Sequence, residues 1–171
     1  MKLKLLPLSA LLVALILAGC GAVSAVVVAL DTLTVAADTA VPFAGAYGPW
    51  LGLVADLSTD AATEISSTDS ATVQAQKILN EASSVVQKLP VVTNASTQTT
   101  QKIQEVTAAL NDLITILQQI LPKTSMMAHA AGVPPGKPMP LEPGDSSKLK
   151  KILGTAHAIQ VKLAAQGANR S

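Results

Sequence analysis

An uncharged apolar run near the start of this chain limits what the chain can fold into. No Asp, Glu, Lys or Arg occurs from Leu5 to Leu30, and two lysines, Lys2 and Lys4, stand just before the run. A single helix over these residues would be about 39 Å long at about 1.5 Å per residue, against a hydrocarbon core about 30 Å thick. The run is therefore either one membrane-spanning helix or an export signal followed by a second apolar element.

The order of residues within the run favours export. A short basic start, an apolar stretch that ends at Ala18 and small residues after it form the layout of a secretory signal. The residues Leu17, Ala18, Gly19 and Cys20 resemble the lipobox of bacterial lipoproteins, in which an invariant cysteine ends such a sequence. The resemblance implies cleavage between Gly19 and Cys20 and acylation of Cys20, with palmitate as one of the fatty acids. It covers the signal alone and indicates no family for the rest of the chain.

The residue after Cys20 bears on the location of the protein. In the sorting pattern of these lipoproteins, Gly21 in place of Asp implies the outer membrane of a Gram-negative cell, on its periplasmic face. The apolar sequence "GAVSAVVVAL" that follows Cys20 departs from the polar tether common in the family. We expect an exported protein whose partner is the membrane, through the lipid anchor. We also expect such a protein to have a protein partner, either another envelope protein or a second copy of the same chain.

Composition favours an all-α fold. Apolar residues make up 49% of the chain but aromatic residues only 2%, so the core must consist of Ala, Val, Leu and Ile, which suit close helix packing. We expect a lipoprotein signal at 1–19 and a small helical bundle of about four helices at 20–121. A Pro/Gly-rich linker at 122–145 and a basic amphipathic helix at 146–171 follow.

Helical spacing of apolar residues predicts the four bundle helices. They cover residues 22–39, 49–65, 70–89 and 97–121, and the last two should pair as an antiparallel hairpin. Pro122 is expected to end the last of them. Its seam is the most regular in the chain: Ile103, Val106, Leu110, Leu113, Leu117 and Ile120.

All three aromatic residues of the chain, Phe43, Tyr47 and Trp50, fall between the first two predicted helices. Trp and Tyr are enriched at membrane interfaces, so this segment could anchor the protein at lipid headgroups. Large side chains also close the corner between two helices. We favour the interpretation that these side chains close a corner between the two helices.

The C-terminal part combines a linker with a basic helix. The sequence "GVPPGKPMPLEPGD" contains five prolines and three glycines, and such a segment acts as a semi-rigid spacer. Ser146 or Ser147 should cap the helix that follows. We expect the spacer to keep 146–171 from packing firmly on the bundle. The basic residues of this helix would then contact an anionic envelope surface or the acidic Asp56–Asp69 face of the bundle. These residues are Lys148, Lys150, Lys151 and Lys162.

Catalytic motifs are absent from the sequence. The two histidines, His129 and His157, have no nucleophile or metal-ligand motif around them. Asp56, Asp60 and Glu64 repeat at helical spacing and place three carboxylates on one helix face, which we interpret as a solvated surface rather than a metal site. We therefore expect no enzymatic activity, no cofactor, no metal site and no nucleic-acid partner.

Three hypotheses for function follow. The first is a non-enzymatic, lipid-anchored cell-envelope protein with a structural or interaction role. The alternative is a small holin-like membrane protein with spans near 5–29 and 39–55 and a basic cytoplasmic tail, as the positive-inside tendency would require. A third is an exported protein whose bundle encloses an apolar ligand.

Overall fold

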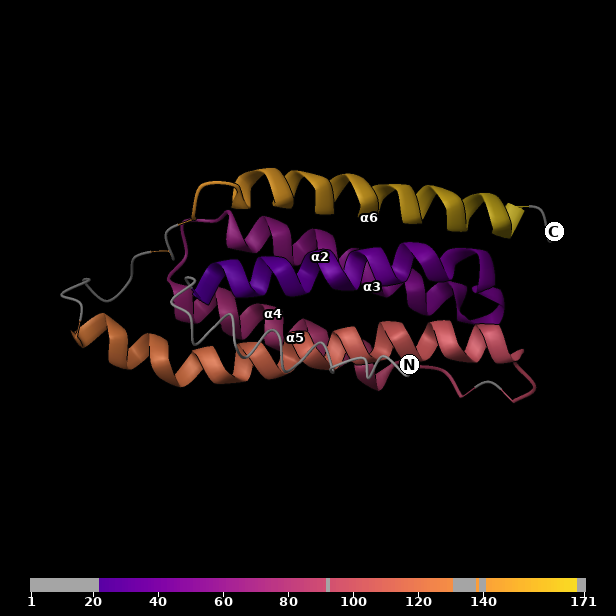
Figure 1. Ribbon diagram of the computed structural model, residues 1–171, viewed down its shortest axis with the longest axis horizontal. Coiled ribbons are helices and arrows are strands. Elements are labelled where there is room, and N and C mark those ends of the chain that lie inside the picture. The colour runs from indigo at the N-terminus through magenta and orange to yellow at the C-terminus, as the bar shows by residue number, and fades with distance from the viewer. Residues whose placement is uncertain (1–21, 92, 131–137, 139–140, 169–171) are drawn as a thin grey trace, which may run out of the picture.

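The computed structural model (Figure 1) describes residues 22–91, 93–130, 138 and 141–168, and for residues 22 and 122–130 it describes the backbone alone. Within that part the chain is helical and contains no strand. The elements in order are α2 (Ala22–Ala40), the 3₁₀ turns η1 (Val41–Phe43) and η2 (Gly45–Tyr47), α3 (Gly48–Ile65), α4 (Ala71–Gln87), α5 (Thr97–Ala130) and α6 (Asp145–Ala168). The prediction of an all-α fold organised as a small helical bundle is confirmed.

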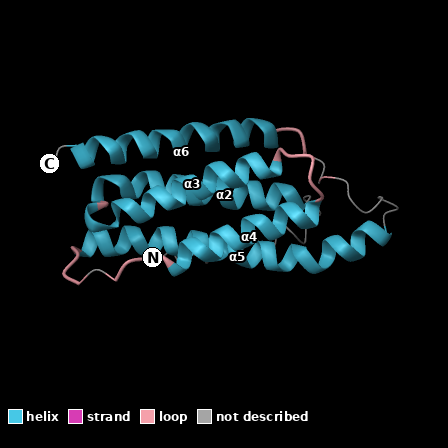
Figure 2. Cartoon of the chain, turned by 180° about the vertical axis from the view of Figure 1, so that it is seen from behind, coloured by secondary structure: helices cyan, strands magenta, loops and turns pink. Residues whose placement is uncertain are grey.

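The helices form three layers. In Figure 1, α6 forms the upper layer, α2 and α3 the middle layer, and α4 and α5 the lower layer, and Figure 2 shows the same order from behind. Helix α2 packs against α3, α5 and α6, and α3 packs against α2, α4 and α6. The middle layer is therefore covered on both sides.

Each connection reverses the direction of the chain, which gives the bundle two ends. The proximal end contains the start of α2, the loop 66–70 and the start of α6. The distal end contains the corner 41–47, the connection between α4 and α5, and the end of α6. Because α2 and α6 run in the same direction, α6 is bonded to α2 at the proximal end and to the adjacent η1 at the distal end. There Gln166 Nε2 donates a 3.1 Å hydrogen bond to the carbonyl oxygen of Val41.

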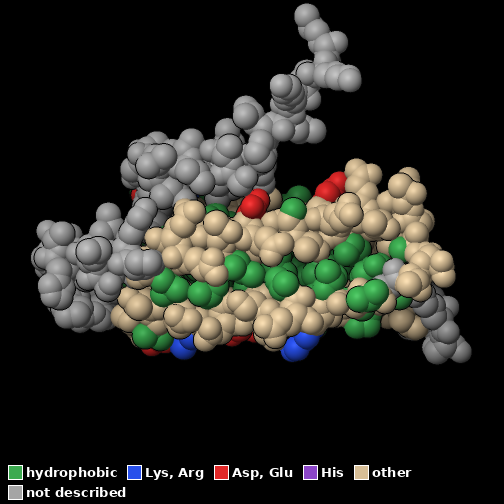
Figure 3. All heavy atoms as spheres, turned by 90° about the horizontal axis from the view of Figure 1, so that it is seen from below, with side chains coloured by type: hydrophobic (Ala, Val, Ile, Leu, Met, Phe, Trp, Pro, Cys, Tyr) green, Lys and Arg blue, Asp and Glu red, His purple; other side chains and the backbone are tan. Residues whose placement is uncertain are grey.

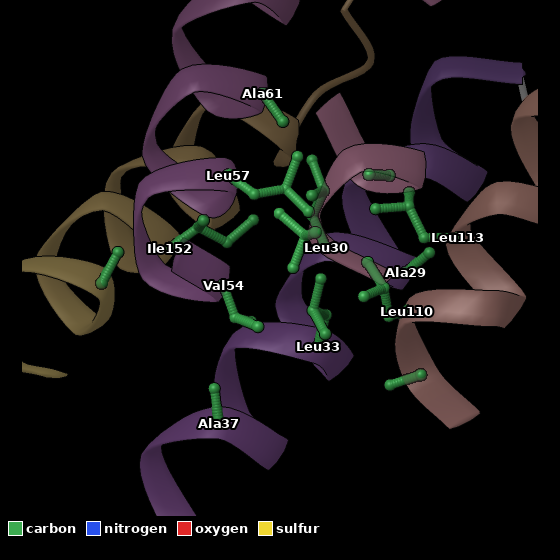
Figure 4. Packing of buried hydrophobic residues seen from close by; sticks show 14 of the residues in the cluster. Ala29, Leu30, Leu33, Ala37, Val54, Leu57, Ala61, Leu110, Leu113 and Ile152 are labelled. Atoms are coloured by element: carbon green, nitrogen blue, oxygen red, sulfur yellow. The ribbon is translucent and has the colours of Figure 1, made fainter. Parts of the chain in front are cut away.

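The position of α2 explains the apolar sequence that follows Cys20. Leu30 and Leu33 are fully buried, and Figure 4 shows Leu30 between Leu57 and Ile152 on one side and Leu110 on the other. Burial of one Leu contributes about 1.5–3 kcal/mol, so these contacts are a large part of the core. A helix with neighbours on several sides must be apolar on several faces. The part of this sequence from Ala22 onward is thus that of a core helix.

Aromatic side chains close the corner between α2 and α3. Trp50 and Tyr47 are buried, and Trp50 Nε1 donates a 2.9 Å hydrogen bond to the carbonyl oxygen of Val85 at the end of α4. The interpretation as a closed corner is confirmed for these two side chains, and an interfacial role for them is wrong because the bundle covers them. Phe43 is half-buried. Residues 39–55, the second span of the two-span alternative, contain this corner and not one continuous helix.

Helix α5 is longer than predicted. The helix expected to end at Leu121 continues through Pro122 to Ala130. A proline inside a helix removes one backbone hydrogen bond and bends or breaks the helix, but the buried residues before it, Leu117 and Ile120, hold the helix in the bundle. The added turns extend past the other helices at the proximal end (Figure 1).

Helix α6 packs on the middle layer, so the expectation that residues 146–171 stand apart from the bundle is wrong. Its stripe of Leu149, Ile152 and Ile159 is buried against α2 and α3. The partly buried side chain of Leu163 adds to this packing beside Gly48 and Gly52 of α3. Gln160 Nε2 donates a 3.0 Å hydrogen bond to the carbonyl oxygen of Gly52, which also holds α6 on α3.

Candidate functional site

A buried carboxylate organises the proximal end. Asp145 is the first residue of α6 and is 1% exposed, and its Oδ2 accepts hydrogen bonds from Ser24 Oγ at 2.8 Å and from the Glu142 backbone N–H at 3.1 Å. A buried carboxylate is costly unless it is hydrogen-bonded, so these bonds fix the start of α6 against the first turn of α2. This pair was not predicted from the sequence. Ser146 or Ser147 was expected at the helix start, although an acid after Pro-Gly is itself a helix-start signal.

The expected cleavage and lipidation residues, Gly19 and Cys20, lie outside the described residues. Helix α2 begins at Ala22, two positions after Cys20. Two residues of extended chain span at most about 7 Å. Any group attached to Cys20 is therefore held close to the proximal end of the bundle.

Two of the four lysines expected to contact an anionic surface pair with α2 instead. Lys151 Nζ lies 3.1 Å from Asp31 Oδ1, and Lys162 Nζ lies 2.6 Å from Asp38 Oδ1. For these two lysines the expected contact with the acidic face 56–69 of the bundle is wrong. Helix α6 runs beside α2, and their ammonium groups pair with carboxylates of α2 instead. Exposed pairs of this kind contribute about 0–1 kcal/mol.

The other two lysines, Lys148 and Lys150, belong to the first two turns of α6. Both are exposed, and neither forms an ion pair with the part of the chain that the structure describes. The last turn of α6 contains no basic residue. The positive charge of α6 is therefore concentrated toward the proximal end.

The three carboxylates predicted on one face of α3 have different partners. Gln160 Nε2 of α6 donates a 2.7 Å hydrogen bond to Asp56 Oδ1, while Lys77 Nζ of α4 lies 3.1 Å from Glu64 Oε1. Asp60 is exposed between them. Among the described residues, no group of His, Cys, Asp and Glu side chains is arranged to hold a metal ion.

Charges between α3 and α4 perturb one another. Lys77 Nζ donates a 2.6 Å hydrogen bond to Asp69 Oδ2; this contact lowers the pKa of the Asp69 carboxyl and raises the pKa of the Lys77 ammonium. Burial raises the pKa of the Glu81 carboxyl, and the neighbouring charges of Asp60 and Glu64 raise it further. These side chains form an exposed ion-pair network in which the ionised form of Glu81 is disfavoured. The network contains no nucleophile.

Two surface grooves lie at the distal part of the bundle. The first, of about 490 Å³, lies between the start of α3 and the end of α6, and Asp56 is the one ionisable side chain among the described residues that line it. The second, of about 430 Å³, lies between the corner, the end of α4 and the start of α5, and is lined by Tyr47, Thr100 and Thr107 among others. His157 is exposed on α6, and the side chain of His129 lies outside the described residues. Neither groove combines a nucleophile with a base.

The lower layer presents an apolar seam. Figure 3 shows a band of hydrophobic side chains along the face made by α4 and α5, with charged side chains toward the margins. The two helices contribute partly buried apolar residues that pack on the core: Leu79, Val86, Ile114 and Leu121. The outer surface of the bundle is therefore not uniformly polar.

Comparisons with models of protein families, with curated proteins and with solved structures find no match for this chain. Within the described residues, one segment, Val23–Phe43, is long and apolar enough to cross a membrane, with a mean hydropathy of 1.6. Half of its most apolar window is buried inside the bundle. A core helix and a membrane span share these properties, so the segment alone does not distinguish between them.

Proposed function

We propose that this chain is an exported lipoprotein, cleaved before Cys20 and attached to the membrane through acyl chains on that residue. The observation that supports the proposal is the position of α2 in the middle layer of the bundle. Residues 22–40 pack against α3, α5 and α6, and charged side chains of α6 lie beside them, which does not suit a helix surrounded by hydrocarbon. The long apolar run then divides into a removable signal and a core helix, and the lipobox-like residues stand at the division.

Polar contacts of α2 add support. Thr34 Oγ1 donates a 3.1 Å hydrogen bond to Ser58 Oγ on α3, and both hydroxyls are buried. Asp31 and Asp38 form ion pairs with α6. A helix that crosses hydrocarbon avoids charged side chains because burial of each costs several kcal/mol, about 2.5–3.5 kcal/mol for Asp at the centre of an inserted helix. These partners fit a helix of a water-exposed bundle.

The proposal assigns the bundle a structural or interaction role on the envelope and no catalysis. With Gly21 after Cys20, the expected location is the periplasmic face of the outer membrane in a Gram-negative cell. The apolar seam between α4 and α5 is the surface that supports an interaction role, with an envelope protein or a second copy of the chain as the partner (Figure 3).

Metabolic labelling tests the proposal. Labelled palmitate should be incorporated into the parent chain in a bacterial host and be lost in Cys20→Ala. A second variant, Cys20→Ala with Thr68→Cys, restores a thiol at an exposed loop position and should remain unlabelled. Equal labelling of the parent and Cys20→Ala, or no labelling of the parent, would contradict lipid attachment at Cys20.

A further inference from the structure

The proximal end of the bundle has little freedom to leave a membrane that holds Cys20. Only Gly21 separates Cys20 from Ala22, the first residue of α2, and Ser24 is already buried. With at most about 7 Å of chain between the anchor and the bundle, the proximal end must stay at the level of the lipid headgroups. This step rests on the proposed function.

The lysines of α6 lie mainly near its N-terminus, where the helix dipole disfavours positive charge. A helix N-terminus carries a partial positive charge, which disfavours lysines in the first turns and favours them in the last turn. Lys148 and Lys150 occupy the first two turns, and the last turn has no basic residue. Lys151 is offset by Asp31, but Lys148 and Lys150 have no ion-pair partner among the described residues. An anionic surface beyond the proximal end would supply the missing partner.

Apolar side chains are exposed at the same end. Leu141, just before α6, is 38% exposed, and Val73, in the first turn of α4, is 44% exposed. Lysines beside exposed apolar side chains suit a bilayer interface, where both the headgroup charge and the acyl boundary are within reach. Acidic residues also lie at this end, among them Glu142, which is exposed, and Asp69, which is paired with Lys77.

We propose that the proximal end rests directly on the bilayer that holds the anchor. The last turns of α5, which extend past the other helices at this end, enter the bilayer interface (Figure 1). Leu141 and Val73 face the headgroup region, and Lys148 and Lys150 contact anionic headgroups. The bundle then stands on the membrane with its distal end pointing away. Since α2 has 19 residues, the distal end lies about 28 Å farther from the surface, at about 1.5 Å per residue.

Site-directed fluorescence quenching on the lipidated full-length protein tests this orientation. Acylation consumes the thiol of Cys20, which is the one cysteine of the chain, so an introduced cysteine is the sole labelling site. Thr68→Cys and Ser147→Cys mark the proximal end, and Ala46→Cys and Gln98→Cys mark the distal end at exposed positions. The protein is reconstituted in phosphatidylethanolamine–phosphatidylglycerol vesicles that contain nitroxide-headgroup lipid.

Strong quenching at the two proximal positions and little at the two distal positions is the expected result. Similar quenching at both ends would mean that the bundle lies on its side, and no quenching at either end would mean that it hangs free; each would overturn the proposal. Thiol labelling of the parent protein would instead report a free Cys20, which is the failure of lipid attachment and not of the orientation.

A charge variant tests the lysines separately. Lys148→Glu with Lys150→Glu should reduce proximal quenching in the anionic vesicles, within the range that the short tether allows, and leave it unchanged in vesicles of phosphatidylcholine alone. The control, Lys162→Glu, lies toward the distal end and should not reduce proximal quenching. Because exposed charges are screened over about 8 Å at physiological ionic strength, added salt should shrink the difference between parent and variant. Unchanged quenching in the double variant would overturn the headgroup contact.

Discussion

Ser24 Oγ donates a 2.8 Å hydrogen bond to Asp145 Oδ2 and so joins the first turns of α2 and α6 across 121 sequence positions. Ser24→Ala removes this bond and leaves Asp145 Oδ2 with the hydrogen bond from the Glu142 backbone N–H. An unsatisfied buried polar group costs about 1–3 kcal/mol, so we expect a loss of that size in the free energy of unfolding, measured by urea denaturation. Ser147→Ala, at an exposed position of the same turn, should change it by less than about 0.5 kcal/mol. Equal effects of the two variants would contradict a role for the buried pair.

Helix α6 should contribute to the stability of the whole bundle. Ile152→Ala removes a fully buried side chain and should lower the free energy of unfolding by about 2–5 kcal/mol. Leu153→Ala is the matched control on the same helix, because Leu153 is 36% exposed. If the two variants melt at the same temperature, α6 is not part of the core.

The position of Glu81 predicts a pH-dependent stability. Burial and the neighbouring carboxylates raise the pKa of Glu81, so the folded state holds its proton more tightly than the unfolded state. Glu81 therefore lowers the free energy of unfolding at neutral pH, and this penalty disappears as the pH falls below the ordinary value of 4.5. Glu81→Gln should raise the urea midpoint at pH 7, by a modest amount because the side chain is largely solvated.

The same comparison at acid pH supplies the control for Glu81. In a titration of the urea midpoint against pH, the gain from Glu81→Gln should fade as Glu81 itself becomes protonated. A gain of equal size at acid pH would show that the variant acts through packing rather than charge. A lower midpoint at pH 7 would show that the ionised carboxylate is stabilising.

Regular apolar spacing made the helices of the bundle predictable. Leu110, Leu113 and Leu117 recur at intervals of three and four, and all three are buried in α5. Such a pattern marks the apolar face of a helix whatever covers it. The same property limits the prediction for α6, where the stripe was evident but the helices that cover it were not.

Other features depend on contacts between distant parts of the chain. The bond between Ser24 and Asp145 joins two polar residues that no periodic pattern connects. The hydrogen bond from Gln160 Nε2 to the carbonyl oxygen of Gly52 joins α6 to α3 across 108 sequence positions, and no pattern in the sequence indicates it. Pro122 indicated a helix end, but the packed turns before it keep α5 continuous. Lipid attachment at Cys20 stays a prediction from the sequence resemblance.

The intact mass of the protein extracted from membranes tests the account most directly. The account predicts a chain that begins at Cys20 and carries the added mass of a diacylglyceryl group, with or without a third acyl chain. That mass would exclude a retained span at 5–29. A chain that retains Met1 and an unmodified Cys20 would contradict the account.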